Sequence, residues 1–270
     1  MIASAAQLRL RVGDLTGNRS VARRAIEEAA QAGARLVVLP ELTPSGYVFT
    51  DKAEAATLSE DLDGPTVTEW MGLAAEHDLV IVGGLAERGA SAALFNTAVV
   101  IDPSGLRATY RKAHLWDLEK EIFNAGDDRP PVIETVIGRI AVMVCYDLEF
   151  PEWVRIAAIA GADILCVPTN WPLAPRPVDE RPGEVVRAQA AASTNRIYVI
   201  AADRCGVERG VEWTGGSVIV DPDGFPLAGP VSADEPALLL AEIDVHRARD
   251  KALGERNDVL DDRRTDLYGP

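Results

Sequence analysis

Short apolar runs alternate along the chain with amphipathic segments, and this alternation predicts an α/β protein. The run "RLVVLP" at 35–40 is continuously apolar, which is typical of a strand buried on both faces. Segment 17–34 places its apolar residues at helical spacing and has Gly33 as its stop. The expected elements that follow are a helix and three strands, at 66–78, 79–87, 94–105 and 106–112.

Two segments of the first half recur in the second half. "AGARLVVLP" at 32–40 matches "AGADILCVP" at 160–168, and "NTAVVIDPSG" at 96–105 matches "GGSVIVDPDG" at 215–224. Both DPxG segments suit a tight turn between paired strands, because Asp bonds the local backbone and Gly tolerates positive φ. Chance similarity between buried strands is the alternative interpretation. We favour two similar α/β halves whose sheets pack face to face with helices outside, a four-layer α-β-β-α sandwich.

The domain organisation is expected to be simple. No linker pattern interrupts residues 1 to about 245, so we predict a single domain over 1–270. Segment 245–270 is rich in charge, and we expect this C-terminal tail to dock on a partner subunit.

Composition and charge restrict the class of protein. The 270 residues are 47% hydrophobic and 26% charged, which is ordinary for a globular chain. The net charge of −15 argues against nucleic-acid binding, and either solubility or a salt-tolerant host explains it. No apolar run approaches the ~20 residues of a membrane span, and we see no signal peptide. The odd number of cysteines argues against a disulfide framework, so we expect a cytoplasmic protein.

Cys145 stands out among the three cysteines. In "RIAVMVCYDLEFPE" at 139–152 it follows an apolar strand and precedes a predicted helix. A helix N-terminus favours a thiolate, and a sharp strand-to-helix turn projects the side chain clear of the sheet. The alternative is an inert buried thiol, which is our interpretation of Cys166 and Cys205.

A thiol nucleophile needs a base, and histidine is poorly placed to supply it. His77 ends a predicted helix, His246 lies in the charged tail, and His114 has an equally good structural interpretation. Glu41 follows the buried strand at 35–40 directly, where desolvation would raise its pKa toward that of a general base. The alternative is a glutamate in water at a strand end.

A cation is also available near the end of a strand. Lys112 ends the strand at 106–112 in a chain that contains few lysines, and its charge could hold a thiolate and an oxyanion. Glu119 follows seven residues later, but local spacing does not distinguish it from Asp117 or Glu121.

Three motifs in order, "LPELTPSGY", "YRKAHLW…E…F.AGD" and "CYDLEFPE", resemble those of the carbon–nitrogen hydrolase family, the nitrilase superfamily. The resemblance continues through "VPTNWP", "RAQAAASTNRIYVIAADR" and "GGSVIVDPDG", so it covers essentially the whole chain. It is strongest to the short, single-domain branch that hydrolyses small amides. One departure is "NAGD" in place of the commoner Pro–Gly–Asp, which is expected to change only a loop.

The resemblance implies a set of catalytic roles. Cys145 matches the family's nucleophile, Glu41 its general base, Lys112 its cation and Glu119 its second glutamate, which orients the amide. The backbone N–H of Tyr146 would complete an oxyanion hole with Lys112. The family resemblance also implies the α-β-β-α sandwich and a homodimer or higher homo-oligomer, with contacts through the helices after the cysteine and after "NWP".

The substrate is the least determined feature. Trp116, Trp171 and Tyr47 are expected to narrow the pocket, and Asn170 either bonds the substrate or shapes its turn. We predict an amidase for small aliphatic amides, with no cofactor and no metal, because no set of His or Cys has ligand spacing. A nitrilase uses the same nucleophile, and a non-catalytic dimeric scaffold is a further alternative. Arg176 or Arg181 binding a carboxylate would instead indicate an ω-amidase or N-carbamoyl amino acid hydrolase.

Overall fold

The structure is a computed structural model that describes residues 1–268, and two six-stranded sheets form within them. The first sheet has the strand order β14 (Ala237–Glu242), β1 (Ile2–Gln7), β2 (Ala34–Val38), β3 (Val80–Arg88), β4 (Leu94–Asp102), β5 (Gly105–Arg111). The second has the order β13 (Pro226–Ala228), β12 (Val218–Val220), β9 (Tyr198–Ala202), β8 (Ile164–Pro168), β7 (Gly138–Val142), β6 (Val132–Thr135). A separate hairpin pairs β10 (Val207–Glu208) with β11 (Val211–Glu212).

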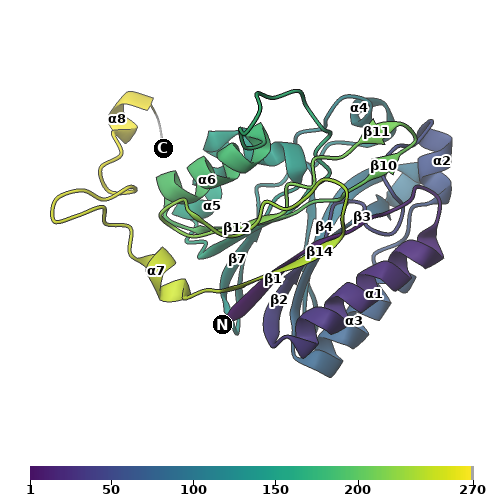
Figure 1. The fold of residues 1–270 in the computed structure, drawn as a ribbon, viewed down its shortest axis with the longest axis horizontal. Helices are drawn as coiled ribbons and strands as arrows, with labels where there is room; N and C mark the ends of the chain where they lie inside the picture. The colour runs from purple at the N-terminus through teal and green to yellow at the C-terminus, as the bar shows by residue number, and fades with distance from the viewer. Residues whose placement is uncertain (269–270) are drawn as a thin grey trace.

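The longer helices cover the outer faces of the two sheets (Figure 1). The first sheet carries α1 (Leu15–Gln31) and α3 (Pro65–His77), and the second carries α5 (Pro151–Ile159) and α6 (Gly183–Asn195). The shorter helices are α2 (Lys52–Thr57), η1 (Ala90–Ala92), α4 (Glu119–Ile122), η2 (Cys145–Glu149), α7 (Val245–Arg249) and α8 (Thr265–Tyr268). The predicted four-layer α-β-β-α sandwich is confirmed.

The two halves repeat the same order of strands. β2 is the central member of the parallel set β1–β2–β3, and β8 is the central member of β7–β8–β9. An antiparallel hairpin follows each set, β4–β5 in the first half and β12–β13 in the second. In each hairpin turn an aspartate, Asp102 or Asp221, accepts a hydrogen bond from the backbone N–H two residues on. Gly105 and Gly224 have φ of 118° and 91°, as the DPxG segments predict.

The core explains why β2 is apolar from Leu36 to Val38. Leu36 and Val38 belong to the cluster between the two sheets, whereas Val37 packs on the other face with Ile26 of α1 and Trp70 of α3. Successive side chains of a strand point to opposite faces, so a strand covered on both sides has no solvated position. Burying each such side chain contributes about 1.5–3 kcal/mol.

The helix predicted after the cysteine is present as α5, and a short turn separates it from Cys145. A 3-10 turn, η2, precedes α5, which begins at Pro151, so the helix does not start directly at the cysteine. Proline is well tolerated in the first helical turn because its missing N–H would have no partner there.

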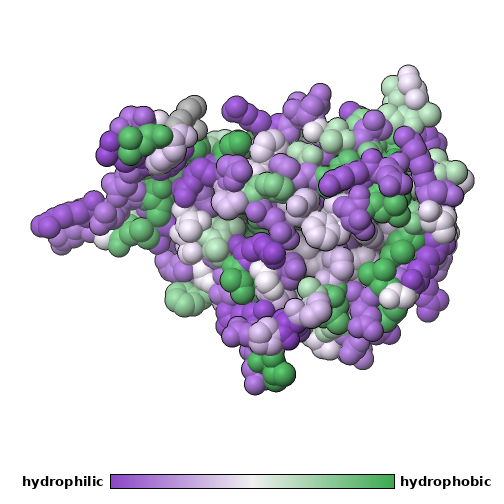
Figure 2. Space-filling model, turned by 90° about the horizontal axis from the view of Figure 1, so that it is seen from above, coloured by the Kyte–Doolittle hydropathy of each residue, from purple (hydrophilic) through white to green (hydrophobic). Residues whose placement is uncertain are grey.

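The C-terminal tail first contacts the rest of the chain and then extends from the body of the molecule (Figure 1). The visible surface of the body is largely hydrophilic (Figure 2). The Lys251 ammonium donates to the backbone oxygens of Asn195 and Arg196 after α6, and Arg155 of α5 donates to the Val259 oxygen. Residues 269–270 of the predicted tail lie outside the described residues. Its docking on a partner subunit stays a prediction.

Gly84 on β3 allows a close approach that a side chain would prevent. A Cβ there would lie 2.7 Å from the Glu41 Cα and 2.8 Å from the Leu42 backbone nitrogen. Gly84→Ala should therefore lower the free energy of unfolding by about 1–3 kcal/mol. Gly72 lies in α3, and a Cβ at this position would have nothing within 4 Å of it, so Gly72→Ala should raise stability by about 0.5–1 kcal/mol. Denaturant titration of both variants tests this, and equal stabilities would contradict it.

Candidate active site

The three residues Glu41, Lys112 and Cys145 lie just beyond the ends of β2, β5 and β7. The two sheets are joined at this point. The Glu41 backbone N–H donates to the Thr169 oxygen at 3.4 Å, and the Asn170 side-chain amide donates to the Glu41 oxygen at 2.9 Å. Residues contributed by both halves therefore meet at the seam of the sandwich.

Glu41 is fully buried, and its two carboxylate oxygens have different surroundings. Oε1 accepts from the Lys112 ammonium at 2.8 Å and from the Asn96 amide at 2.6 Å. Oε2 is buried and has no hydrogen-bond partner among residues 1–268. Burial raises the pKa of Glu41 to about 7, against the opposing effect of the Lys112 charge. One oxygen is thus anchored and the other is available to take a proton.

Lys112 is the cation of the site. Its ammonium lies 2.8 Å from Glu41 Oε1 and 2.8 Å from Glu119 Oε1, and the lysine side chain has no exposed surface. Burial opposes its charge, but Glu119 and Glu41 outweigh burial and hold the pKa of Lys112 well above its usual range. An ammonium has three donors. The two carboxylates use two of them, which leaves one for a further acceptor.

Cys145 occupies a strained position in the turn after β7. Its φ is 47°, in the left-handed region that costs a non-glycine residue roughly 1–3 kcal/mol. Its Sγ lies 3.8 Å from the Asn170 backbone oxygen. Burial and the charge of Glu41 raise the pKa of the Cys145 thiol well above its usual range. At rest the side chain is therefore a thiol, and it needs a base to remove its proton, as the sequence analysis expects.

Tertiary packing distinguishes Glu119 from its acidic neighbours, which local spacing does not. Glu119 opens α4 and is buried, whereas Asp117 and Glu121 are exposed. Its Oε1 accepts from the Tyr47 hydroxyl at 2.7 Å in addition to Lys112, and its Oε2 accepts from the Trp116 backbone N–H at 3.0 Å. Glu119 and Glu41 therefore both accept hydrogen bonds from the Lys112 ammonium.

Asp147 fixes the turn that carries Cys145. Its buried carboxylate accepts from the Tyr110 hydroxyl at 2.8 Å, from the Val144 backbone N–H at 3.1 Å and from the His114 backbone N–H at 3.0 Å. The His114 ring nitrogen Nδ1 lies 2.6 Å from the same carboxylate. This contact supports the structural interpretation of His114 and ties the loop after Lys112 to the cysteine turn.

Two cavities adjoin the site. One of about 280 Å³ contains Cys145 and is lined by Tyr146, Asn170, Trp171 and Trp116, among others. The second, of about 330 Å³, is largely apolar and contains Trp116 again with Tyr47, Glu119, Trp213 and Phe123, among others.

The five residues predicted to bind substrate thus all line one of these cavities, but their contacts differ. Trp171 is buried and Trp116 is 43% exposed, with its ring edge-on to Tyr146 at 4.8 Å. Tyr47 holds Glu119 through its hydroxyl. The amide nitrogen of Asn170 donates to the Glu41 backbone oxygen, whereas its side-chain oxygen is buried without a partner among residues 1–268.

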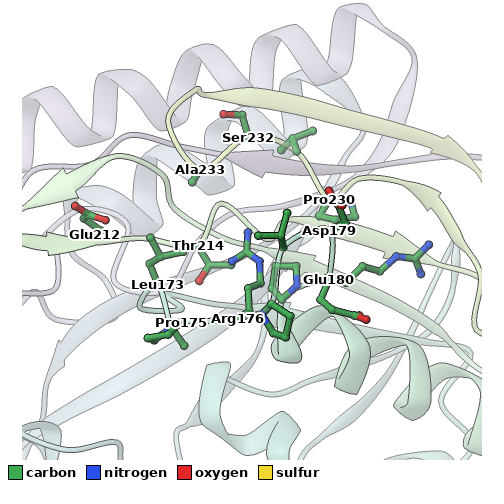
Figure 3. A pocket seen from close by; sticks show the side chains of 16 residues that line it. Leu173, Pro175, Arg176, Asp179, Glu180, Glu212, Thr214, Pro230, Ser232 and Ala233 are labelled. Carbon is green, nitrogen blue, oxygen red and sulfur yellow. The ribbon is translucent and has the colours of Figure 1, made fainter.

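Arg176 and Arg181 lie elsewhere. They line a separate surface hollow of about 830 Å³ formed by the loop of residues 173–182, with Ser232 and Ala233 on its opposite rim (Figure 3). Arg181 donates to the Gln189 side chain at 2.7 Å. Neither arginine lines the cavity that contains Cys145.

Two supporting features were missed from the sequence. Asn96 is a buried polar residue in β4, most of whose buried positions are apolar, and this contrast is the signal for it. Arg204 and Glu208 form a buried ion pair with N–O distances of 2.6 Å and 3.0 Å. Glu208 also accepts from the backbone N–H of Tyr47 and Val48, so this pair positions the tyrosine that holds the second glutamate.

Asp147→Asn should loosen the cysteine turn. The change places an amide donor opposite N–H and O–H donors, and a lost charge-assisted hydrogen bond costs about 1.5–3 kcal/mol. Asp128→Asn, the same chemical change at an exposed position, should have almost no effect. Denaturant unfolding of the two variants measures the difference. An Asp147→Asn protein as stable as the Asp128→Asn protein would show that the carboxylate does not hold the turn.

Comparison with known proteins identifies relatives over most of the chain. The carbon-nitrogen hydrolase family model matches residues 2–252. A nitrilase from Pyrococcus abyssi is 37% identical over 254 residues, 93% of this chain and 92% of that protein. An (R)-stereoselective amidase from a Pseudomonas species is 33% identical over 97% of each chain.

Solved structures give the same result. The amidase from Nesterenkonia sp. AN1, with acrylamide added to its active-site cysteine, has a TM-score of 0.82 at 29% identity, covering 99% of this chain and 98% of that one. A mutant of that amidase in complex with butyramide has a TM-score of 0.80 at 28% identity, covering 99% and 95%. Within residues 1–268 no helix is long and apolar enough to cross a membrane, and no cluster of three metal-ligating side chains occurs. The chain belongs to the carbon-nitrogen hydrolase family.

Proposed function

We propose that this protein is an amidase that hydrolyses small aliphatic amides to the carboxylic acid and ammonia through a thioester on Cys145. One observation carries the proposal: Glu41 keeps a free buried oxygen and Lys112 a free donor at the seam where Cys145 enters a small cavity. The related amidase structures with acrylamide and butyramide support an amide substrate of this size.

In the first half of the reaction, Glu41 Oε2 takes the thiol proton while Sγ bonds to the amide carbonyl carbon. Negative charge develops on the carbonyl oxygen, and the free donor of Lys112 and the backbone N–H of Tyr146 stabilise it. Each such donor is worth roughly 3–4 kcal/mol in the transition state. Burial raises the pKa of the Cys145 thiol, so the thiol holds its proton until Glu41 removes it.

In the second half, Glu41 passes the proton to the nitrogen, the C–N bond breaks and ammonia leaves. The acyl group remains on Sγ as a thioester. Water then gives a proton to Glu41 while the water oxygen attacks the thioester carbonyl. The C–S bond breaks, Glu41 returns the proton to Sγ, and the carboxylic acid is released. Glu119, fixed by Tyr47 and Lys112, orients the amide throughout.

The shape of the cavity supports short acyl groups. The aromatic side chains of Trp116 and Trp171 wall the 280 Å³ space in front of Cys145, which is at the small end of the range for ligand sites. A carboxylate-bearing substrate has less support, because Arg176 and Arg181 line another hollow. A nitrilase activity, named for the Pyrococcus abyssi relative, would use the same nucleophile.

Ammonia release from a substrate panel tests the proposal. We expect purified protein to hydrolyse acetamide, propionamide and butyramide faster than an aromatic amide, glutamine, an N-carbamoyl amino acid or the matching nitriles. Cys145→Ala should remove all turnover and leave the fold unchanged by circular dichroism. Activity confined to the nitriles or to carboxylate-bearing amides would overturn the substrate assignment, and activity of Cys145→Ala would overturn the thioester mechanism.

The pH dependence of kcat/KM tests the role of Glu41. The base must be unprotonated to accept the thiol proton, and its pKa is about 7. The rate constant should therefore fall about tenfold per pH unit below that pKa and level off above it. Glu41→Gln should lose activity at every pH. A kcat/KM that does not change between about pH 5 and pH 8 would exclude Glu41 as the titrating base.

A further inference from the structure

The cavity in front of Cys145 has a charged wall that the proposed reaction does not use. Glu149, Glu184 and Arg187 line this cavity together with the aromatic residues described above. Glu149 is the last residue of η2, four positions after Cys145, and the other two lie in the first turns of α6. The turn that presents the nucleophile therefore also presents one of these charges.

The two acids outnumber the single cation on this wall. Arg187 Nη2 lies 3.3 Å from Glu149 Oε2, and Arg187 Nη1 lies 3.6 Å from Glu184 Oε1. Both separations are longer than an ordinary hydrogen bond, so the guanidinium is shared between the carboxylates and committed fully to neither. The wall has a formal net charge of −1 when all three groups are ionised.

The acids are also less solvated than the arginine. The exposed fractions of the side chains are 26% for Glu149, 16% for Glu184 and 42% for Arg187. Burial raises the pKa of Glu149, Arg187 opposes the shift and the Glu184 charge adds to it. Screening by water is weaker for partly buried charges, so an ionised group on a substrate in this cavity interacts with the carboxylates appreciably.

We propose that Glu149 and Glu184, with Arg187 between them, act as a charge filter: they exclude amides whose acyl chain carries a carboxylate and admit neutral or ammonium-bearing acyl chains. A substrate carboxylate would face two like charges and compete with both for one guanidinium. An ammonium would meet carboxylates that Arg187 does not fully neutralise, because the two acids share one guanidinium at 3.3 Å and 3.6 Å. This inference deepens the proposed function and rests on it.

Kinetics on three amides of similar length test the filter. Butyramide is neutral, 4-aminobutyramide is cationic and succinamate is anionic. In the wild-type protein kcat/KM should be lowest for succinamate. Glu149→Gln should raise the succinamate-to-butyramide ratio of kcat/KM by about tenfold and lower the 4-aminobutyramide-to-butyramide ratio by a similar factor, the effect of one charge at ~6 Å in a partly solvated site. Glu184→Gln should act in the same direction and serves as the second variant if Glu149→Gln does not fold.

Glu152→Gln is the matched control. Glu152 lies on the exposed first turn of α5, three residues after Glu149, and does not line the cavity. Glu152→Gln removes the same charge from the chain. The kcat/KM ratios of succinamate and of 4-aminobutyramide to butyramide should therefore stay at their wild-type values. Succinamate as the preferred substrate, with Arg187→Gln abolishing that preference, would overturn the filter and make Arg187 a carboxylate receptor.

A second readout separates the filter from the amidase function. Cys145 is modified with methyl, aminoethyl and sulfonatoethyl methanethiosulfonate, which are neutral, cationic and anionic, and the adducts are counted by intact-protein mass spectrometry. Cys145→Ala corrects for reaction at Cys166 and Cys205. The cationic reagent should modify Cys145 faster than the anionic one. Glu149→Gln should reduce the ratio of the cationic to the anionic modification rate by about tenfold.

The outcomes are distinguishable. Charge-selective modification in a protein that releases no ammonia from any amide would sustain the filter and overturn the amidase. Amide hydrolysis with charge ratios that Glu149→Gln and Glu184→Gln leave unchanged, in both kinetics and thiol modification, would sustain the amidase and overturn the filter.

Discussion

The buried ammonium of Lys112 is the interaction on which the site depends. It lies between the carboxylates of Glu41 and Glu119 with its side chain wholly inaccessible to solvent. Removing each such charge from water costs several kcal/mol, and attraction offsets that cost only where the geometry is good and the other polar atoms find partners. Asn96 and Tyr47 supply much of that partnership. The loops around the site supply hydrogen bonds that complete this network, such as that from the Trp116 backbone N–H to Glu119.

This requirement places the site at the seam of the two sheets. The backbone of Glu41 bonds to residues 169 and 170, which belong to the other half of the sandwich. The strained backbone of Cys145 is likewise held from outside its own turn, since Asp147 receives bonds from Tyr110 on β5 and from His114. Neither half alone would keep these groups in place. The inter-sheet core is therefore as necessary to the site as the residues within it.

The sequence predicted the features that depend on local pattern. Repeated apolar runs and DPxG turns led to two matching halves, because strand burial and turn geometry are encoded in adjacent residues. Glu41 and Lys112 stood out as candidates because each lies at the end of a predicted strand, and the family resemblance suggested their roles. Glu119 was not selected by its spacing, since only tertiary packing separates it from its exposed acidic neighbours. The sequence does not show how strongly the Cys145 thiol holds its proton, because burial and the nearby Glu41 charge are properties of the folded chain.

The proposed chemistry depends on the polar groups that the network leaves without a hydrogen-bond partner. Most buried polar atoms in folded proteins have a hydrogen-bond partner. Glu41 Oε2 has none among residues 1–268, and this lowers the stability of the fold. Under the proposed mechanism that oxygen accepts the thiol proton, and the third donor of Lys112 meets the oxyanion. Both groups are held by their other hydrogen bonds and need little reorganisation when charge develops, which is the condition for strong electrostatic stabilisation. The same bonds that fix the fold at the seam thereby leave one acceptor and one donor free for the proposed reaction.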